Sequence, residues 1–239
     1  MQTIYLARNN LSYERTEQIN TLRSNVQFAG SDKRVILFTS CIQGEGKSTI
    51  SLEFATSLVA LGKNVLYIDA DLRASVFVGK ITGAKPSIGL SHVLSGQNPI
   101  QDAEYATNIP GLFVIAAGPT PPNPTELFSS SYFTNMINTL RNVYDYIIID
   151  SAPLGMVVDA AIIAKNSDGV ILIVESGLIK KKFAQKVTSH LVNTGCPIVG
   201  VVLTKMKSSS ASRYYSKYYG KYYKLEEKSK NHRKPVRRR

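Results

Sequence analysis

Six apolar runs of strand length, most of them without polar alternation, set the strongest limit on the fold of this chain. The runs are Val35 to Thr39, Val65 to Ile68, Leu112 to Ala116, Tyr146 to Ile149, Val170 to Val174 and Ile198 to Leu203. Uninterrupted apolar strands are typical of sheets that are covered on both faces. Helix-length segments separate the runs, roughly at Lys47 to Leu61, Ser87 to Leu94, Thr125 to Arg141, Val158 to Ala164 and Ile179 to Asn193. The alternation predicts an α/β fold, a doubly wound and mostly parallel sheet with helices on both faces.

The two ends of the chain differ from this middle part. Within residues 1–30, the segment Ser12 to Phe28 carries apolar residues near helical spacing, which predicts an amphipathic helix that docks on the domain or on a neighbouring subunit. Residues 207–239 offer hardly any aliphatic side chain to bury, which predicts a mobile tail. We therefore divide the chain into an N-terminal helix that could serve oligomerisation (1–30), one core domain (31–206) and the tail.

Charge and cysteine content narrow the class of protein. Of the 29 Lys and Arg residues, 13 lie at 205–239, together with only 2 of the 17 Asp and Glu residues, so the tail carries +11 of the net charge of +12. Two cysteines provide neither a disulfide framework nor a metal-ligand spacing. The sequence has no apolar run long enough to span a membrane and no signal-peptide pattern, so we expect a cytoplasmic protein.

A phosphate-binding loop follows the first apolar run. It ends in Gly44-Glu45-Gly46-Lys47-Ser48-Thr49 and leads into a predicted helix, which is the strand-loop-helix context that the pattern GxxxxGK[ST] requires. Cys41 stands where that pattern begins with glycine, so the match depends on the end of the loop and its context. Glycines allow backbone N–H groups to surround phosphates, Lys47 is suited to the β- and γ-phosphates, and Ser48 to Mg²⁺.

Three aspartates end two other predicted strands. Asp69 and Asp71 follow Val65 to Ile68, and Asp150 ends the run from Tyr146. Carboxylates beside a triphosphate can order Mg²⁺ and its waters, or accept a proton from an attacking hydroxyl. Each aspartate alone is also compatible with an ordinary turn at the end of a strand. Because ligands of such sheets bind at the carboxyl ends of the strands, the three signals together predict one nucleotide site.

The tail contains six of the thirteen tyrosines, arranged in three pairs that repeat every four residues. They are Tyr214, Tyr215, Tyr218, Tyr219, Tyr222 and Tyr223. We consider three interpretations, which are an aromatic helix face, a surface for nucleic acid or membrane, and acceptors of the γ-phosphate. Gly220 and the lack of aliphatic neighbours disfavour the helix face, and no recognisable fold for binding specific nucleic acid is present. We favour the acceptor interpretation.

These motifs together resemble the bacterial tyrosine kinases of capsule and exopolysaccharide assembly, relatives of the partitioning and cell-division-site ATPases. The resemblance covers nearly the whole chain and includes the segments Gly89 to Gly96 and Gly118 to Leu127, to which the sequence assigns no chemistry. It implies an enzyme that uses ATP and Mg²⁺ to phosphorylate its own tyrosine cluster between neighbouring subunits. In that assignment Lys47 and Gly46 steer phosphate, and Ser48 and Asp150 organise Mg²⁺. Asp69 is the candidate base, and Asp71 aids either the metal or the alignment.

The resemblance also implies partners. These are a membrane-anchored activator of the polysaccharide co-polymerase type, which would hold the kinase at the inner face of the membrane, a homo-oligomer such as a ring, and a cognate tyrosine phosphatase. The family's Glu-x-x-Arg-x-x-Arg motif of the ring has Asn20 at its middle position here, between Glu17 and Arg23. The alternative is a switch ATPase of the partitioning type with a basic tail, but Ile42 stands where that branch carries an extra lysine.

Overall fold

The computed structural model describes residues 1–7, 11–30 and 32–206. Residues Met1–Thr204 form one compact unit, and Lys205–Arg239 are assigned to a second unit, of which only the first two residues are described. The six tail tyrosines therefore lie outside the described residues. Among the described helices, none is long and apolar enough to cross a membrane.

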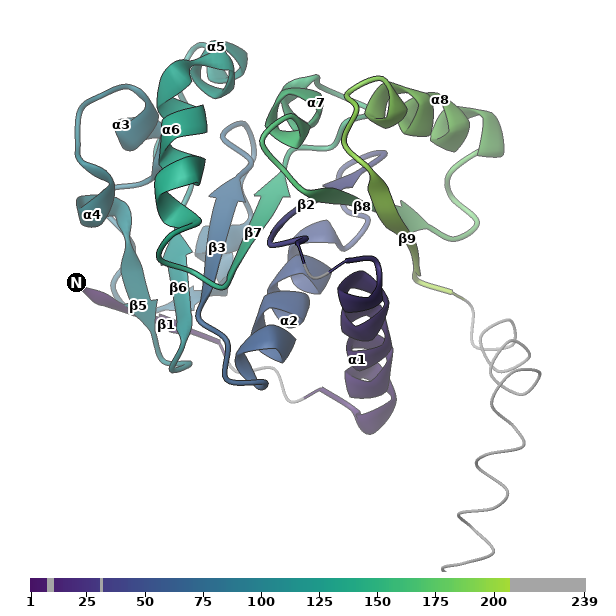
Figure 1. Ribbon diagram of the computed structural model, residues 1–239, viewed down its shortest axis with the longest axis horizontal. Coiled ribbons are helices and arrows are strands. Elements are labelled where there is room, and N and C mark those ends of the chain that lie inside the picture. Colours follow the sequence, from purple (N-terminus) through teal and green to yellow (C-terminus); the bar gives the residue numbers. More distant parts are fainter. Residues whose placement is uncertain (8–10, 31, 207–239) are drawn as a thin grey trace, which may run out of the picture. The chain divides into compact units, whose positions relative to one another are not determined.

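The first unit is built on a sheet of nine strands in the order β4-β1-β5-β6-β3-β7-β2-β8-β9. The strands are β1 (Thr3–Leu6), β2 (Val35–Ser40), β3 (Val65–Ala70), β4 (Ile81–Thr82), β5 (Tyr105–Thr107), β6 (Leu112–Ile115), β7 (Tyr146–Ser151), β8 (Gly169–Glu175) and β9 (Ile198–Thr204). The run from β6 to β9 is parallel throughout, as expected for strands linked by helical crossovers. All six predicted strands are present, and the predicted doubly wound fold is confirmed (Figure 1).

Three strands that the sequence does not indicate extend the sheet on one side. Strands β1, β4 and β5 have four, two and three residues, too few for a pattern of apolar residues to stand out. Two of the pairings here are antiparallel, β1 with β4 and β5 with β6. The residues before the first predicted strand therefore contribute to the sheet as well as to a helix.

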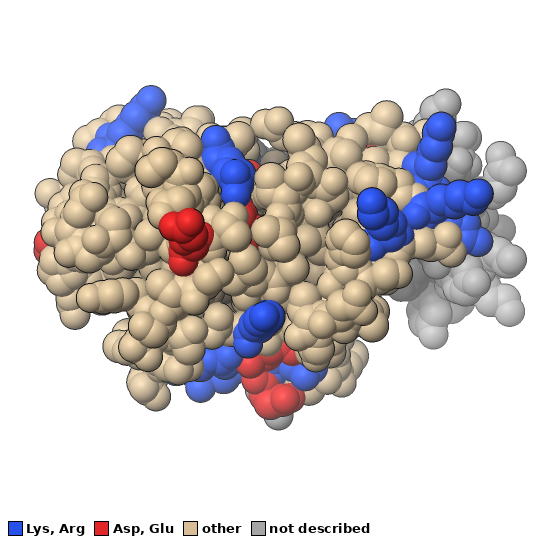
Figure 2. All heavy atoms as spheres, turned by 90° about the horizontal axis from the view of Figure 1, so that it is seen from above, with Lys and Arg blue, Asp and Glu red and all other residues tan. Residues whose placement is uncertain are grey.

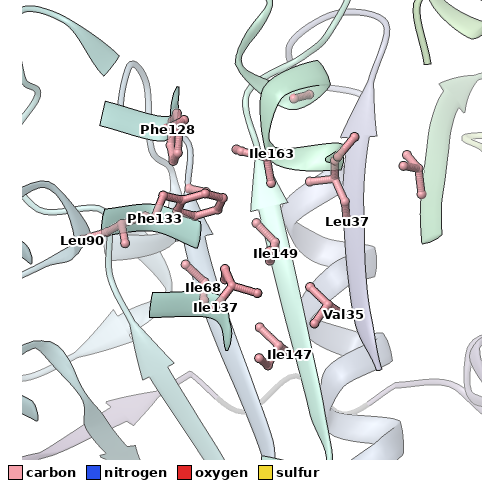
Figure 3. Packing of buried hydrophobic residues seen from close by; sticks show 14 of the residues in the cluster. Val35, Leu37, Ile68, Leu90, Phe128, Phe133, Ile137, Ile147, Ile149 and Ile163 are labelled. Atoms are coloured by element: carbon pink, nitrogen blue, oxygen red, sulfur yellow. The ribbon is translucent and has the colours of Figure 1, made fainter. Parts of the chain in front are cut away.

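Helices cover both faces of the sheet, because alternate residues of each central strand point to opposite sides. The helices are α1 (Tyr13–Phe28), α2 (Lys47–Val59), α3 (Leu90–Leu94), α4 (Ile100–Ala103), α5 (Pro124–Ser129), α6 (Ser131–Leu140), α7 (Asp159–Ala164) and α8 (Lys181–Val192), with a 3-10 turn η1 at Phe77–Lys80. Ile36 and Phe38 of β2 pack with α1 and α2, whereas Val35 and Leu37 face α6 and α7. Figure 3 shows this second layer, where Phe133 and Ile137 lie beside Ile149.

The N-terminal helix docks on its own domain. Ser12 caps α1 by accepting a hydrogen bond from the N–H of Arg15, and Ile19 and Val26 are buried against the layer that contains α2. The predicted apolar face ends before Phe28, whose exposed fraction is 87%. Phe28 is the last residue of α1, and because its side chain is exposed it adds nothing to the buried face of the helix.

The segment predicted as one helix from Thr125 to Arg141 forms two helices. Ser130 has extended backbone angles, φ −73° and ψ 155°, and separates α5 from α6. Phe128 at the end of α5 and Phe133 at the start of α6 then meet edge to face at 5.4 Å between ring centroids. Both rings are fully buried, so the break allows each helix to bury its own aromatic residue.

Candidate active site

The loop between β2 and α2 has the backbone of a phosphate-binding loop. Gly44 and Gly46 adopt left-handed angles, with φ of 86° and 89°, which other residues rarely adopt. Helix α2 begins at Lys47 without a side-chain cap, so its first N–H groups and the positive end of its dipole face the edge of the sheet. This arrangement suits an anion with several oxygens, as the sequence predicts.

Lys47 and Asp150 form a buried ion pair at the centre of the site. The Lys47 ammonium donates to Asp150 Oδ1 at 2.8 Å and to Ser48 Oγ at 3.3 Å. The other carboxylate oxygen, Asp150 Oδ2, is buried and has no hydrogen-bond partner among the described residues. A buried carboxylate oxygen without a hydrogen bond is costly, so this oxygen fits an additional cation beside the Lys47–Asp150 ion pair.

The surroundings of Asp150 fit Mg²⁺ held jointly with phosphate. Among the described residues, no group of three His, Cys, Asp or Glu side chains could hold a metal ion alone. Mg²⁺ is usually bound by one or two carboxylates, substrate phosphates and water, so Asp150 and Ser48 are sufficient protein ligands. Ser48 and Asp150, which the sequence assigns to the metal together with Asp71, both lie within hydrogen-bond reach of Lys47, and their role as metal ligands stays a prediction.

Asp69 lies opposite Asp150 in the pairing of β3 with β7. It is 1% exposed and accepts hydrogen bonds from the Ser75 hydroxyl and, at 3.4 Å, from the N–H of Asp71. Burial, followed by the negative charge of Asp150, raises the pKa of Asp69 to about 7. A carboxyl group with this pKa can hold or release a proton at neutral pH, which a general base must do.

Asp71 is bound to the turn after β3. Its Oδ1 accepts from the N–H groups of Ala74 at 3.0 Å and Arg73 at 3.4 Å. Arg73 in turn forms an ion pair with Asp159 at 2.6 Å, so the turn is fixed to the start of α7. Asp71 lies at the same edge of the sheet as Asp69, and its carboxylate stabilises the turn after β3 through these hydrogen bonds.

Asp159 is a site residue that the sequence does not single out. It is 1% exposed and also accepts from the Thr125 hydroxyl at 2.8 Å, which joins α5 to α7. One acidic residue at the start of an apolar helical segment is normally explained by the helix dipole. Its burial beside Arg73 is a tertiary contact with no local sequence signal.

The side chains of Glu45 and Thr49 form hydrogen bonds with other residues of the protein. The Glu45 carboxylate is fully buried and accepts hydrogen bonds from the backbone N–H groups of Ile42 and Glu175, so both of its oxygens have partners inside the protein. Thr49 Oγ1 accepts from Lys80 Nζ at 3.2 Å. Cys41 is buried, and burial, with the charge of Glu45, raises the pKa of its thiol to about 11.

The two segments without assigned chemistry meet each other beside the site. The N–H groups of Leu90 and Ser91 donate to the carbonyls of Ala116 and Ala117 at 2.7 and 3.0 Å. A Cβ atom on Gly89 would lie 2.6 Å from Ala116 O and from Gly118 Cα. The glycines of both segments thus permit a backbone contact that positions α3 and the loop before α5.

The edge where the strands end is sparsely charged. Figure 2 looks onto this edge and shows a group of basic side chains at the right end and scattered basic and acidic side chains elsewhere, with most of the surface between them uncharged. Lys47, Asp69 and Asp150 are buried and contribute little to that surface. The chemistry of the site is therefore concentrated below the surface.

The fold and this loop define the class of P-loop nucleotide-binding proteins. A family model described as "AAA domain" matches residues 33–196. The tyrosine-protein kinase CpsD of Streptococcus agalactiae is 42% identical over 196 residues, which cover 82% of this chain and 84% of that protein. The chain belongs to the family of bacterial tyrosine-protein kinases, which are enzymes of the P-loop class.

Solved structures agree with this assignment. The chimerical protein CapA2B2 superposes with a TM-score of 0.78 at 30% identity and covers 87% of this chain and 95% of its own. The septum site-determining protein MinD of Pyrococcus horikoshii, complexed with Mg-ADP, has a TM-score of 0.59 at 25% identity and covers 71% of this chain and 69% of its own. The kinase domain of the Escherichia coli tyrosine kinase ETK, at 26% identity over 81% of this chain and 78% of its own, has a TM-score of 0.75, so the fold is shared with a tyrosine kinase as well as with MinD.

Proposed function

We propose that this protein transfers the γ-phosphate of Mg²⁺-ATP to tyrosines of its own C-terminal tail, on a neighbouring copy of the chain. The buried Lys47–Asp150 pair, with the unpartnered Asp150 Oδ2, is the observation that carries the proposal. The proposal is supported because a cation suited to phosphate, at the start of α2, lies beside a carboxylate suited to a metal, near the end of β7. The membership of the chain in the tyrosine-kinase family supports tyrosine as the acceptor.

The transfer needs a base, and Asp69 is the best placed residue. A bond forms between the tyrosine oxygen and the γ-phosphorus, the bond from that phosphorus to the oxygen of ADP breaks, and the phenolic proton passes to Asp69. Its pKa of about 7 leaves part of the carboxyl ionised at neutral pH, and Ser75 holds its orientation. Asp71, which fixes the turn after β3, keeps Asp69 aligned.

Ser48 and Asp150 would hold Mg²⁺, which supplies positive charge to the phosphate oxygens during transfer. Lys47 is within 2.8 Å of Asp150, so the same carboxylate can orient both the lysine and a metal-bound water. The backbone N–H groups between Gly44 and Thr49 complete the contacts to phosphate. ATP, and not another nucleoside triphosphate, follows from the family alone.

The acceptors are the three tyrosine pairs between Tyr214 and Tyr223, which the described residues do not include. Transfer between subunits requires that copies of the chain meet, in a ring or another oligomer. Arg23, from the motif assigned to the ring, donates to the Ser57 carbonyl at 2.7 Å, and Glu17 accepts from Asn20 at 3.2 Å. The Arg23 hydrogen bond holds α1 on α2, whereas the Glu17–Asn20 hydrogen bond lies within α1. Helix α1 would thus meet a neighbour as a helix already docked on its own domain.

The biological setting that we propose is the control of capsular or extracellular polysaccharide polymerisation and export. A membrane-anchored activator of the co-polymerase type would hold the kinase at the inner face of the membrane, and a cognate phosphatase would reverse its action. Thirteen Lys and Arg residues at 205–239 would favour the anionic leaflet, and phosphotyrosines would oppose this attraction.

A mixing experiment tests the proposal. One chain carries Lys47→Met with an intact tail, and the other carries an intact site with Tyr→Phe at all six tail positions. With Mg²⁺-ATP and a peptide of the membrane partner, we expect phosphate on the tail of the Lys47→Met chain, detected by mass spectrometry. Each variant alone should stay unmodified.

Two outcomes would overturn the proposal. Phosphate on the wild-type tail but never on the mixed chains would exclude transfer between subunits. Rapid ATP hydrolysis with unmodified tyrosines would identify a switch ATPase of the partitioning type, which the likeness to MinD keeps as the alternative.

A further inference from the structure

A carboxylate in a loop that binds phosphates needs an explanation, because like charges repel. Glu45 lies between Gly44 and Gly46, in the part of the loop expected to contact phosphate. Its side chain is fully buried, with an exposed fraction of 0%. The negative charge is thus held inside the protein by specific partners.

Those partners connect the loop to the ends of two strands. Glu45 Oε2 accepts from the N–H of Ile42 at 2.7 Å, which closes the loop on itself. Oε1 accepts from the N–H of Glu175 at 2.8 Å, at the end of β8. The Glu45 carbonyl accepts from Thr204 Oγ1 at 2.8 Å, at the end of β9. Three hydrogen bonds of normal length therefore fix this one residue.

Thr204 contributes to the same arrangement from the last residue of the compact unit. It is 8% exposed, and its Cγ2 lies 3.9 Å from the position that a Cβ on Gly46 would occupy. Its hydroxyl is engaged with the loop backbone, at the carbonyl of Glu45. This hydrogen bond holds the loop backbone at Glu45, two residues before Lys47.

We infer that Glu45 and Thr204 are positioning residues that hold the loop in its phosphate-binding shape before nucleotide arrives. A preformed loop loses less conformational freedom on binding, so these residues should act on nucleotide affinity more than on the rate of transfer. The inference rests on the proposed nucleotide binding and deepens it. It is independent of whether tyrosine is the acceptor.

The first test compares Glu45→Gln with Glu53→Gln by equilibrium binding of a fluorescent ATP analogue in the presence of Mg²⁺. The side-chain amide introduced by Glu45→Gln can accept only one of the two N–H groups and sets its own NH₂ against the other. We expect the dissociation constant to rise roughly 10-fold, while kcat at saturating ATP changes less than about 2-fold. Glu53 pairs with Arg15, which joins α2 to α1 away from the loop, and Glu53→Gln should leave the affinity unchanged.

The second test uses Thr204→Val and Thr204→Ser. Valine keeps the shape and removes the hydroxyl, whereas serine keeps the hydroxyl, so we expect weaker binding for valine and recovery for serine. Thermal melting would show whether Glu45→Gln folds. If it does not, the comparison of Thr204→Val with Thr204→Ser still tests the inference. Equal affinity of wild type, Glu45→Gln and Thr204→Val, or equal losses for valine and serine, would overturn the inference. Absent transfer with the expected affinities would reject only the kinase proposal.

Discussion

Asp69 and Asp150 occupy the same register position of the neighbouring strands β3 and β7, yet their carboxylates have different partners. Asp150 accepts from the Lys47 ammonium at 2.8 Å, whereas Asp69 accepts from the Ser75 hydroxyl and a backbone N–H. This difference in partners is the basis for the two roles that we propose, metal and phosphate binding for Asp150 and proton acceptance for Asp69.

The pH dependence of phosphate transfer should follow Asp69. Because the base must be ionised and its pKa is about 7, the rate should rise with pH up to about 7 and level off above it. Asp69→Asn should lower kcat by about 100-fold or more with little change in ATP affinity. In Ser75→Ala, loss of a hydrogen bond to the ionised form should move the profile to higher pH. A profile unaffected by both variants would exclude Asp69 as the base.

Replacement of Asp150 should uncouple Mg²⁺ from ATP binding. In Asp150→Asn, Lys47 loses its ionic partner and the metal loses its carboxylate, so Mg²⁺ should no longer strengthen nucleotide binding. Calorimetric titrations with and without Mg²⁺ measure this effect. Asp71→Asn, which keeps the Oδ1 acceptor of the turn after β3 and removes only the charge, should preserve most of the Mg²⁺ effect. Equal losses in both variants would contradict the distinction between the two aspartates.

Asp168 should stabilise the domain in a pH-dependent manner. Although burial alone would raise its pKa, hydrogen bonds from Arg141 and from the N–H groups of Val35 and Arg34 hold that pKa below its usual value. The ionised form therefore stabilises the fold fully above the unfolded-state pKa of about 4, and this stability is lost as pH falls through the lower folded-state value. Asp168→Asn should lower the free energy of unfolding by about 2 kcal/mol at pH 7.

Urea unfolding at pH 7 and near the folded-state pKa measures this effect, which should shrink at the lower pH. Asp32→Asn is the matched control, because the Asp32 side chain is 78% exposed and its ion pair with Lys33 spans 3.6 Å. A destabilisation by Asp168→Asn that stays constant down to the lowest pH would show that the charge is not its cause.

Gly89 should tolerate no side chain. In Gly89→Ala the new methyl group would lie 2.6 Å from Ala116 O and Gly118 Cα, both backbone atoms, so the contact between the two segments must open. We expect a lower midpoint of thermal unfolding, equivalent to about 2 kcal/mol or more. Gly79→Ala meets nothing within 4 Å and should leave the midpoint nearly unchanged. Equal midpoints for the two variants would contradict the contact.

The sequence predicted the elements whose signal is local. Six apolar runs indicated the central strands, and a glycine-rich loop before a helix indicated the nucleotide site. Strand β4, with two residues, and the break at Ser130 depend on packing, since Ser130 could continue a helix in another context. Asp159 and the Glu45–Thr204 contact also escaped prediction, because their partners lie far away in the chain.

The ion pair of Lys47 with Asp150 joins residues 103 positions apart, which sets the order in which the site is assembled during synthesis. The phosphate-binding loop leaves the ribosome well before β7, so Lys47 has no carboxylate to meet until the later strand has been translated and inserted between β3 and β2. A nascent chain that ends before β7 contains the whole sequence of the phosphate-binding loop, but it lacks Asp150 and therefore cannot form the site. Nucleotide can therefore engage the finished site only after most of the domain has been made.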